Sequence, residues 1–203
     1  MRQIALPLKP LESGAPRIVI GNANAAVVDA LTGTETWPFH TAVLAGPRRS
    51  GKSLLARWFV ESGKGEALDE AETMDPAEVF HHWNRAQQTG RPLLIVTNAA
   101  PGTWRIALPD LASRLGSALH LEIGTLDDAM LAELIALHGE MRGLVLDQAA
   151  TEYLVPRCER SHLGAERLVE TIDRLSLERK QAPTLSIWRE ALSEAIGHGK
   201  NGT

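Results

Sequence analysis

Short apolar runs alternate with stretches of helical periodicity along most of the chain. The runs have the length of strands and occupy residues 18–20, 42–45, 93–96 and 119–123. Between them, apolar residues recur at helical spacing over residues 25–31, 54–60 and 76–88. Because strands that alternate with helices pair in parallel, the pattern predicts an α/β core. The run at 93–96 is apolar throughout, which is typical of a strand buried on both faces.

From residue 125 onward the apolar spacing is helical to the end of the chain. Thr125 and Asp128 fit a capping box in which Asp replaces Glu, and helices are expected to start near residues 125, 146, 163 and 185. Pro156 interrupts the second of them. We therefore expect a small all-α lid over residues 125–203, after an α/β base over residues 15–124.

The start of the chain differs from both of these parts. Pro7, Pro10 and Gly14 resist helix formation, so residues 1–14 are expected to form an extended tail outside the core. Such a tail either binds a partner or packs as an ordinary leader on its own domain.

Composition narrows the class of protein. A chain of 203 residues with 44% hydrophobic content can bury one α/β core and a small satellite domain. The formal net charge of −4 offers no general basic field, so we expect no direct sequence-specific binding to DNA. The single cysteine cannot form an internal disulfide, and we find neither an apolar leader nor an apolar run of membrane-spanning length. We therefore expect a soluble cytoplasmic protein with no membrane partner.

The candidate chemistry is concentrated in residues 46–53, which match the phosphate-binding pattern G-x-x-x-x-G-K-[ST]. This segment directly follows one predicted strand and directly precedes a predicted helix, which is the context that a P-loop requires. Lys52 is expected to reach the β- and γ-phosphate oxygens, and Ser53 to bind Mg²⁺. The residues expected to surround the nucleotide phosphates are Gly46, Pro47, Arg48, Arg49, Ser50, Gly51, Lys52, Ser53 and Leu54.

A P-loop enzyme also needs acidic residues at the end of a neighbouring strand. Asp69 and Glu70 are the candidates, Asp69 for Mg²⁺ and Glu70 for the attacking water. The strand before them is short, contains Glu66 and follows the P-loop helix almost at once. A strand–helix unit is therefore missing, and the predicted sheet is reduced in strands. The alternative is that Asp69 and Glu70 belong to a solvated acidic turn before the next helix, where carboxylates suit the helix N-terminus.

The order of these segments resembles the DnaA-related AAA+ proteins, and in particular members that lack a DNA-binding domain. Ile20 and Gly21 stand in a segment that resembles the family's adenine-contacting box. Residues 46–53 resemble its Walker A segment, and Asp69 with Glu70 resembles a reduced Walker B. The resemblance implies a P-loop AAA+ core with a small helical lid, and ADP or ATP with Mg²⁺ as ligands.

Two further segments resemble those that the family uses in hydrolysis. Residues 96–101 resemble the sensor 1 segment, with Asn98 as the polar sensor at a strand end. Residues 108–115 resemble the box that carries the arginine finger, which assigns that role to Arg114. The alternative is that Arg114 only caps its helix or pairs with Asp110 one turn earlier. The resemblance implies the initiator DnaA as a partner, and it allows a homo-oligomer.

The tail resembles the family's clamp-binding motif, Gln-Leu-Ser-Leu-Pro-Leu. The matching residues, which would dock in the hydrophobic groove of the sliding clamp, are Gln3, Ile4, Leu6, Pro7 and Leu8. An extended peptide of this kind lays its apolar side chains into a groove while a polar residue fixes the register. The resemblance therefore implies the β subunit of DNA polymerase III as a partner.

The sequence also departs from the family pattern. The second sensor arginine is expected on or near Leu163, with Arg160 and Arg167 out of register. Together with the short acidic strand, this departure predicts weak hydrolysis by the chain itself. The sequence ends soon after residue 196, so we expect no helix-turn-helix domain after the lid.

Two classes of function remain open at this stage. In the first, a nucleotide-bound adaptor docks on the sliding clamp and promotes hydrolysis of ATP held by DnaA, which negatively regulates the initiation of DNA replication. In the second, the chain is a stand-alone P-loop ATPase with an unrelated substrate, or a chaperone-like AAA+ adaptor.

Overall fold

The computed structural model describes residues 17–100 and 102–198. The clamp-motif residues 3–8 therefore lie outside the described part of the chain. The chain forms two compact units that divide after Gly124. No helix within the described ranges is long and apolar enough to cross a membrane.

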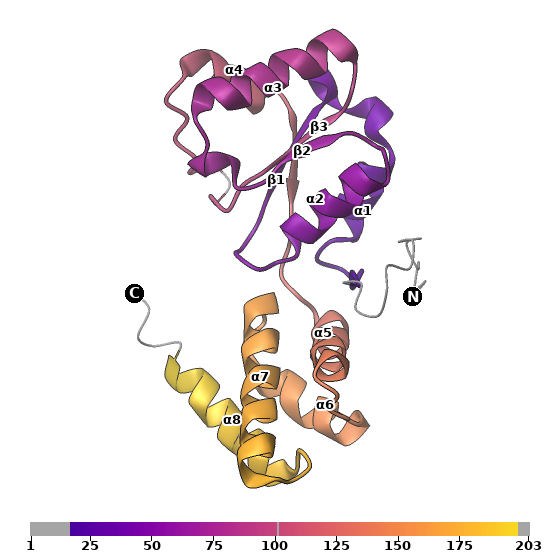
Figure 1. Ribbon diagram of the computed structural model, residues 1–203, viewed down its shortest axis with the longest axis vertical. Coiled ribbons are helices and arrows are strands. Elements are labelled where there is room, and N and C mark those ends of the chain that lie inside the picture. Colours follow the sequence, from indigo (N-terminus) through magenta and orange to yellow (C-terminus); the bar gives the residue numbers. More distant parts are fainter. Residues whose placement is uncertain (1–16, 101, 199–203) are drawn as a thin grey trace. The chain divides into compact units, whose positions relative to one another are not determined.

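A four-stranded sheet forms the centre of the first unit (Figure 1). Its strands lie in the order β2-β3-β1-β4, and each pair of neighbours is parallel. The strands are β1 (Thr41–Ala45), β2 (Glu66–Leu68), β3 (Leu93–Val96) and β4 (Leu119–Glu122). The parallel α/β core expected from the alternating pattern is confirmed.

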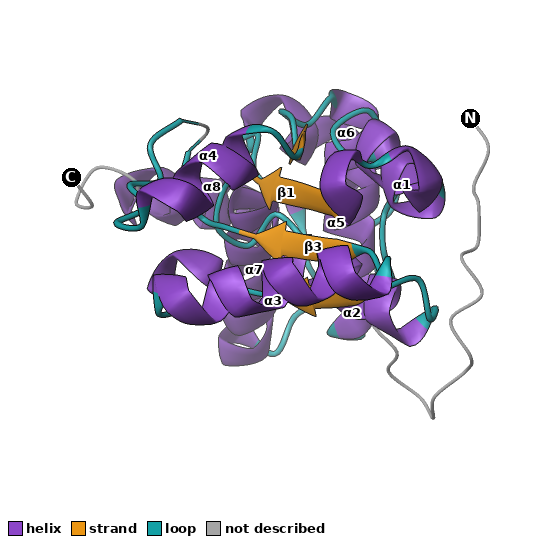
Figure 2. Ribbon diagram, turned by 90° about the horizontal axis from the view of Figure 1, so that it is seen from above, coloured by secondary structure: helices purple, strands orange, loops and turns teal. Residues whose placement is uncertain are grey.

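Helices cover both faces of this sheet. They are α1 (Ala25–Thr32), α2 (Lys52–Glu61), α3 (Pro76–Thr89) and α4 (Pro109–Gly116). In Figures 1 and 2, α1 and α2 lie on one side of the strands, and α3 and α4 lie on the other side. Two helical layers are the usual consequence of joining parallel strands by right-handed crossovers. Short 3₁₀ turns occupy Thr34–Thr36, Pro38–His40 and Ala71–Thr73.

The central strands are buried along their whole length. Every residue of β1 and β3 is buried, which confirms the expectation for residues 93–96 and accounts for their unbroken apolarity. Alternate strand residues point to opposite faces. On the side of α3 and α4, Val43 and Ile95 therefore share a buried cluster with Trp83 of α3 and Leu111 of α4.

The apolar run at 18–20 does not form the expected strand. Residues 17–20 have no regular secondary structure. The carbonyl oxygen of Val19 accepts a hydrogen bond from the side-chain amide of Asn24 (2.8 Å). A local side-chain bond thus takes the place of a neighbouring strand, as Asn residues favour beside turns.

The second unit contains only helices within its described residues. They are α5 (Asp128–Met141), α6 (Gln148–Leu154), α7 (His162–Arg179) and α8 (Leu185–His198), with a 3₁₀ turn at Val155–Arg157. Helix α7 packs against both α5 and α8. The expected cap at Thr125 is replaced by Asp127, whose carboxylate accepts the backbone N–H of Met130 (2.8 Å) and fixes the start of α5.

Gly65, which precedes β2, lies where no larger residue fits. A Cβ at this position would stand 2.3 Å from the carbonyl oxygen of Pro92 and 2.6 Å from the ring of Phe59. We expect Gly65→Ala to lower the free energy of unfolding by about 1–3 kcal/mol, the usual range for overpacking. Gly116→Ala is the matched control, because a Cβ there meets nothing within 4 Å. Urea denaturation measures both variants, and equal midpoints would contradict the expectation.

Candidate functional site

Three loops with predicted site residues start at the same edge of the sheet. The P-loop follows β1, Asp69 follows β2, and Thr97 follows β3. The pairing sets Leu44 of β1 opposite Val96 of β3, and β2 pairs with the other edge of β3. Because the strands are parallel, their carboxyl ends meet at this edge, which is where open α/β sheets bind ligands.

The P-loop turns tightly between β1 and α2. Gly51 has a left-handed backbone (φ +87°) directly before α2, a conformation that residues with side chains rarely adopt. A Cβ at Gly46 would lie 3.1 Å from the Cβ of Ile123, so the loop packs closely on the end of β4. The two glycines of the motif therefore permit the curvature and the close approach that the loop requires.

The side chain of Lys52 lies inside this loop. Lys52 is only 4% exposed, and its Nζ donates hydrogen bonds to the carbonyl oxygens of Gly46 (2.9 Å) and Pro47 (2.7 Å). Burial lowers the pKa of Lys52 below its usual value, while the negative charges of Asp69 and Glu72 act in the opposite direction. The ammonium group thus stands within the loop and in the electric field of the acidic turn.

The start of α2 offers backbone donors to an anion. Among the described residues no side chain caps α2 at Gly51, and the first N–H groups of a helix have no partner within it. The positive end of the helix dipole adds to this attraction. Around these donors Ser50 is buried and Leu54 half-buried, and the exposed loop residues are Pro47, Arg48, Arg49 and Ser53. The loop therefore fits a phosphate group held by amides and one ammonium.

The segment with Ile20 and Gly21 is held in place by Asn24. The Oδ1 atom of Asn24 accepts a hydrogen bond from the Gly21 N–H (3.0 Å), and Asn24 is 3% exposed. The carbonyl oxygen of Ala23 accepts a hydrogen bond from the Gly124 N–H (2.8 Å). Gly124 directly follows Ile123, the residue that packs on Gly46 of the P-loop. The predicted adenine segment thus lies beside the strand that flanks the P-loop. Sequence analysis did not identify Asn24, whose side chain positions this segment.

The acidic turn brings Asp69 and Glu70 to the sheet edge near Asn98. Both carboxylates are exposed, and the Oδ1 atom of Asp69 accepts the backbone N–H of Glu70 (3.0 Å). The side-chain amide of Asn98 lies 3.5 Å from the Oε1 atom of Glu70. The turn is solvated, as the second alternative expects, and it lies beside the predicted sensor. The roles of Asp69 in Mg²⁺ binding and of Glu70 in positioning water stay predictions.

Glu72 joins this group although the sequence motif does not include it. Its Oε1 atom accepts a hydrogen bond from the Asn98 backbone N–H (3.0 Å). Burial raises the pKa of the Glu72 carboxyl, but hydrogen bonds from its own backbone, Asn98 and Thr97 outweigh burial and hold the pKa below its usual value. The only sequence feature that could have indicated a role for Glu72 is its carboxylate, shortly after Asp69 along the chain. The 3₁₀ turn Ala71–Thr73 supplies the geometry.

Ser53 and Asp69 are the predicted ligands of Mg²⁺. Within the described residues, no group of three or more His, Cys, Asp or Glu side chains is arranged to hold a metal ion. Magnesium bound with a nucleotide needs few protein ligands, because phosphate oxygens and water complete its octahedral shell. A hydroxyl and a carboxylate are suitable hard donors, so the Mg²⁺ site stays a prediction that depends on the nucleotide.

Arg114 lies on α4 and packs against aromatic rings of α3. Its guanidinium carbon lies 4.3 Å from the ring centre of Trp83 and 5.0 Å from that of Phe80. No ion pair joins Arg114 to Asp110 in the described part of the chain. The aromatic ring faces attract the positively charged guanidinium. The N–H donors of the guanidinium lie in its own plane. The role of Arg114 as a finger stays a prediction.

The second unit offers no arginine in the first turn of α7, which begins at His162. Arg160, just before that helix, forms an ion pair with Asp128 and donates a hydrogen bond to the carbonyl oxygen of Leu126. Arg167 is exposed further along α7. A sensor arginine at the start of α7 is therefore missing from this chain.

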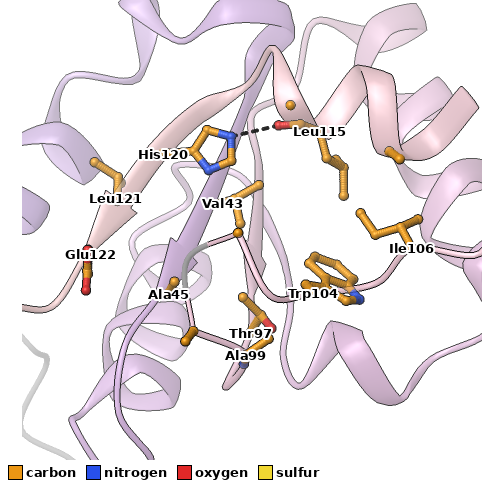
Figure 3. Close-up of a pocket in the computed structure, with 14 residues that line it drawn as sticks. Val43, Ala45, Thr97, Ala99, Trp104, Ile106, Leu115, His120, Leu121 and Glu122 are labelled. Carbon is orange, nitrogen blue, oxygen red and sulfur yellow. Dashed lines mark hydrogen bonds between the residues drawn. The ribbon is translucent and has the colours of Figure 1, made fainter. Parts of the chain in front are cut away.

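A separate apolar cavity of about 350 Å³ opens beside β4 and α4 (Figure 3). Figure 3 shows Trp104 and Ile106 on one side of it and His120 on the other, with the His120 Nε2 donating to the carbonyl oxygen of Leu115 (3.0 Å). None of the P-loop residues lines the cavity. We therefore do not assign nucleotide phosphates to it.

Comparisons with known proteins agree on the fold. No protein-family model matches the sequence. Domain III of the replication initiation protein DnaA from Thermotoga maritima has a TM-score of 0.71 at 12% identity, over 88% of this chain and 95% of that domain. AMPPCP-bound DnaA from Aquifex aeolicus has a TM-score of 0.61 at 16% identity, over 80% of this chain and 66% of that one.

A point variant of RuvB from Thermotoga maritima is also similar, with a TM-score of 0.63 at 17% identity, over 84% of this chain and 67% of that one. The chain thus spans nearly all of the isolated DnaA domain and about two thirds of the longer DnaA and RuvB chains. The chain therefore has the α/β fold of the AAA+ domains of DnaA and RuvB.

Proposed function

We propose that the chain is a nucleotide-binding AAA+ adaptor that negatively regulates the initiation of DNA replication. In this proposal it binds ADP or ATP with Mg²⁺ through the P-loop, and it docks on the sliding clamp through residues 3–8. It then promotes hydrolysis of ATP bound to DnaA through Arg114. This is the role of Hda, the DnaA homologue that lacks a DNA-binding domain.

The buried ammonium of Lys52 carries the nucleotide part of the proposal. A buried charge is stable only with close partners, and Lys52 has two loop carbonyl oxygens, those of Gly46 and Pro47. Phosphate oxygens are stronger acceptors for the same ammonium, because both groups are charged. A bound nucleotide supplies the phosphates, and this chain supplies Lys52, the loop amides and the start of α2. The AMPPCP bound to Aquifex aeolicus DnaA supports the same ligand class.

Weak hydrolysis by the chain itself fits the exposed acidic pair. Efficient hydrolysis needs preorganised groups in a site that excludes water, whereas Asp69 and Glu70 are both exposed. The first turn of α7 adds no arginine to stabilise transition-state charge. The nucleotide then serves mainly as a structural ligand that holds the base together at the sheet edge.

Arg114 suits action on a nucleotide held by a partner. A guanidinium delivered from outside stabilises the charge that develops on a transferring phosphoryl group. In this chain the guanidinium contacts Trp83 and Phe80 of α3, and no interaction in the described residues joins it to the P-loop. The stacked rings restrict its side-chain rotation, which lowers the entropic cost of presenting it to DnaA.

Lys52→Ala removes the ammonium that is proposed to meet the phosphates. A charge-assisted hydrogen bond contributes about 1.5–3 kcal/mol, so we expect affinity for ADP and ATP to fall roughly ten- to a hundredfold. Isothermal titration calorimetry measures this change. Lys64→Ala is the matched control, because the Lys64 ammonium bonds the Thr32 carbonyl oxygen instead of the P-loop. Equal affinities for the wild type and Lys52→Ala would remove the P-loop assignment.

The clamp-docking tail is tested by combining Gln3→Ala with Leu6→Ala. We expect the double variant to lose binding to the sliding clamp in a surface plasmon resonance assay, since both the register-fixing polar group and an apolar anchor are gone. Nucleotide affinity and thermal stability should match the wild type, because in this proposal residues 3–8 contact the clamp and not the folded core. Retained clamp binding, or loss of stability, would show that the tail has another role.

Arg114→Ala tests the trans-acting step. Arginine fingers accelerate phosphoryl transfer by about 10³ to 10⁵, so we expect the variant to lose stimulation of DnaA-bound ATP hydrolysis in a single-turnover assay with clamp-loaded DNA. Its own nucleotide and clamp binding should remain. Arg57→Ala, at an exposed site on α2, is the control. Wild-type stimulation by Arg114→Ala would favour a stand-alone ATPase or a chaperone-like adaptor.

A further inference from the structure

The cavity beside β4 and α4 is a concave site that the proposed function does not use (Figure 3). Its volume of about 350 Å³ lies in the range of small-molecule sites, roughly 300–1,000 Å³. The space arises where small residues line it, among them Ala45 of β1 and Ala112 and Gly116 of α4. A Cβ at Gly116 would meet nothing within 4 Å. The packing of α4 beside β4 therefore leaves room for a small molecule.

One side of the cavity is apolar. Figure 3 shows Trp104 and Ile106 along this side, and both are half-buried. Val43 of β1 and Leu115 of α4 are buried residues of the lining. A ligand that covers these side chains removes apolar surface from water, and an aromatic ring gains a further favourable contact with an indole. The walls therefore favour a ligand with an aromatic body.

The opposite side carries polar groups of β4, which is an edge strand (Figure 3). His120 and Glu122 line the cavity, and both are exposed. Because the His120 Nε2 donates to the carbonyl oxygen of Leu115, the Nδ1 atom of the neutral ring is left as an acceptor. Lys and Arg are absent from the described residues of the lining. This side therefore accepts hydrogen bonds and attracts a cation, whereas an anion meets the like charge of Glu122.

We propose that the cavity binds small aromatic molecules that carry a cationic amine. The aromatic ring packs against Trp104 and Ile106, and the ammonium donates hydrogen bonds to the carboxylate of Glu122 on the opposite side. Charge then decides specificity, because an anionic ring compound of the same shape cannot form this ion pair. The proposal goes beyond the proposed function, because the site needs neither the nucleotide nor the clamp.

Three probes with the same ring test this chemistry on the full chain. Tryptamine carries an ammonium, indole has no charge, and indole-3-propionate carries a carboxylate. We expect tryptamine to bind about two- to fivefold more tightly than indole, the usual contribution of an exposed ion pair, and indole-3-propionate to bind more weakly than indole. NMR titration measures the three affinities, and the signals of the Trp104 indole N–H and of the amides of residues 120–122 should shift.

Two variants separate the two sides of the cavity. Glu122→Gln keeps the shape and removes the charge, so tryptamine and indole should then bind within about twofold of each other. Glu78→Gln, at an exposed position of α3, is the matched control and should keep the wild-type ratio. Ala112→Leu places a larger side chain in the cavity, and we expect it to weaken tryptamine and indole alike by about fivefold or more. Ser113→Leu, at an exposed position next to it on α4, is the control.

The wild-type measurements are decisive even if Ala112→Leu fails to fold. Absence of tryptamine binding, equal affinities for tryptamine and indole-3-propionate, or shifts confined to residues away from the cavity would each overturn the proposal. Displacement of tryptamine by adenosine would also overturn it, because the cavity would then belong to the nucleotide site. Failure of the wild type to bind nucleotide or the clamp would instead contradict the proposed function and leave this site unaffected.

Discussion

The parallel pairing of β1 with β3 and β4 is the constraint on which the candidate site depends. Parallel strands release their chains at one edge, so the P-loop, the sensor segment and the end of β4 meet there whatever their distance in the sequence. Helices must then return the chain across both faces, which buries β1 and β3 completely. The short β2 adds the acidic turn beside β3. The same architecture thus forms the core and gathers the polar residues.

Within that frame, the burial of Lys52 links the loop to the acidic turn. The buried Lys52 ammonium loses hydrogen bonds to water, and two carbonyl oxygens of the P-loop replace part of them. Asp69 and Glu72 act at longer range and oppose the lowering of the Lys52 pKa that burial causes. Glu72 in turn holds Asn98. The P-loop motif and the acidic turn are therefore linked by electrostatic interactions, and a hydrogen bond links the acidic turn to the predicted sensor Asn98.

Local signals in the sequence predicted much of this arrangement. The apolar run at 93–96 and the P-loop pattern are contiguous, so the parallel α/β core and the place of Lys52 followed from them. Contacts between distant segments were not predictable in this way. The bond from Glu72 to Asn98 joins residues 26 positions apart through a 3₁₀ turn, and the stacking of Arg114 needs α4 packed beside α3. The run at 18–20 failed as a strand because a side-chain bond from Asn24 replaced the ladder.

Hydrogen–deuterium exchange with mass spectrometry tests the central claim most directly, by comparing the free protein with the protein saturated with Mg²⁺–ADP or with adenosine. If the P-loop holds the phosphates, ADP slows amide exchange in residues 46–55 and around residues 20–25, because bound amides must open before they exchange. Adenosine, which lacks phosphates, should leave residues 46–55 unchanged. Equal exchange in those residues with and without ADP, or protection confined to the cavity beside Trp104, would contradict the account.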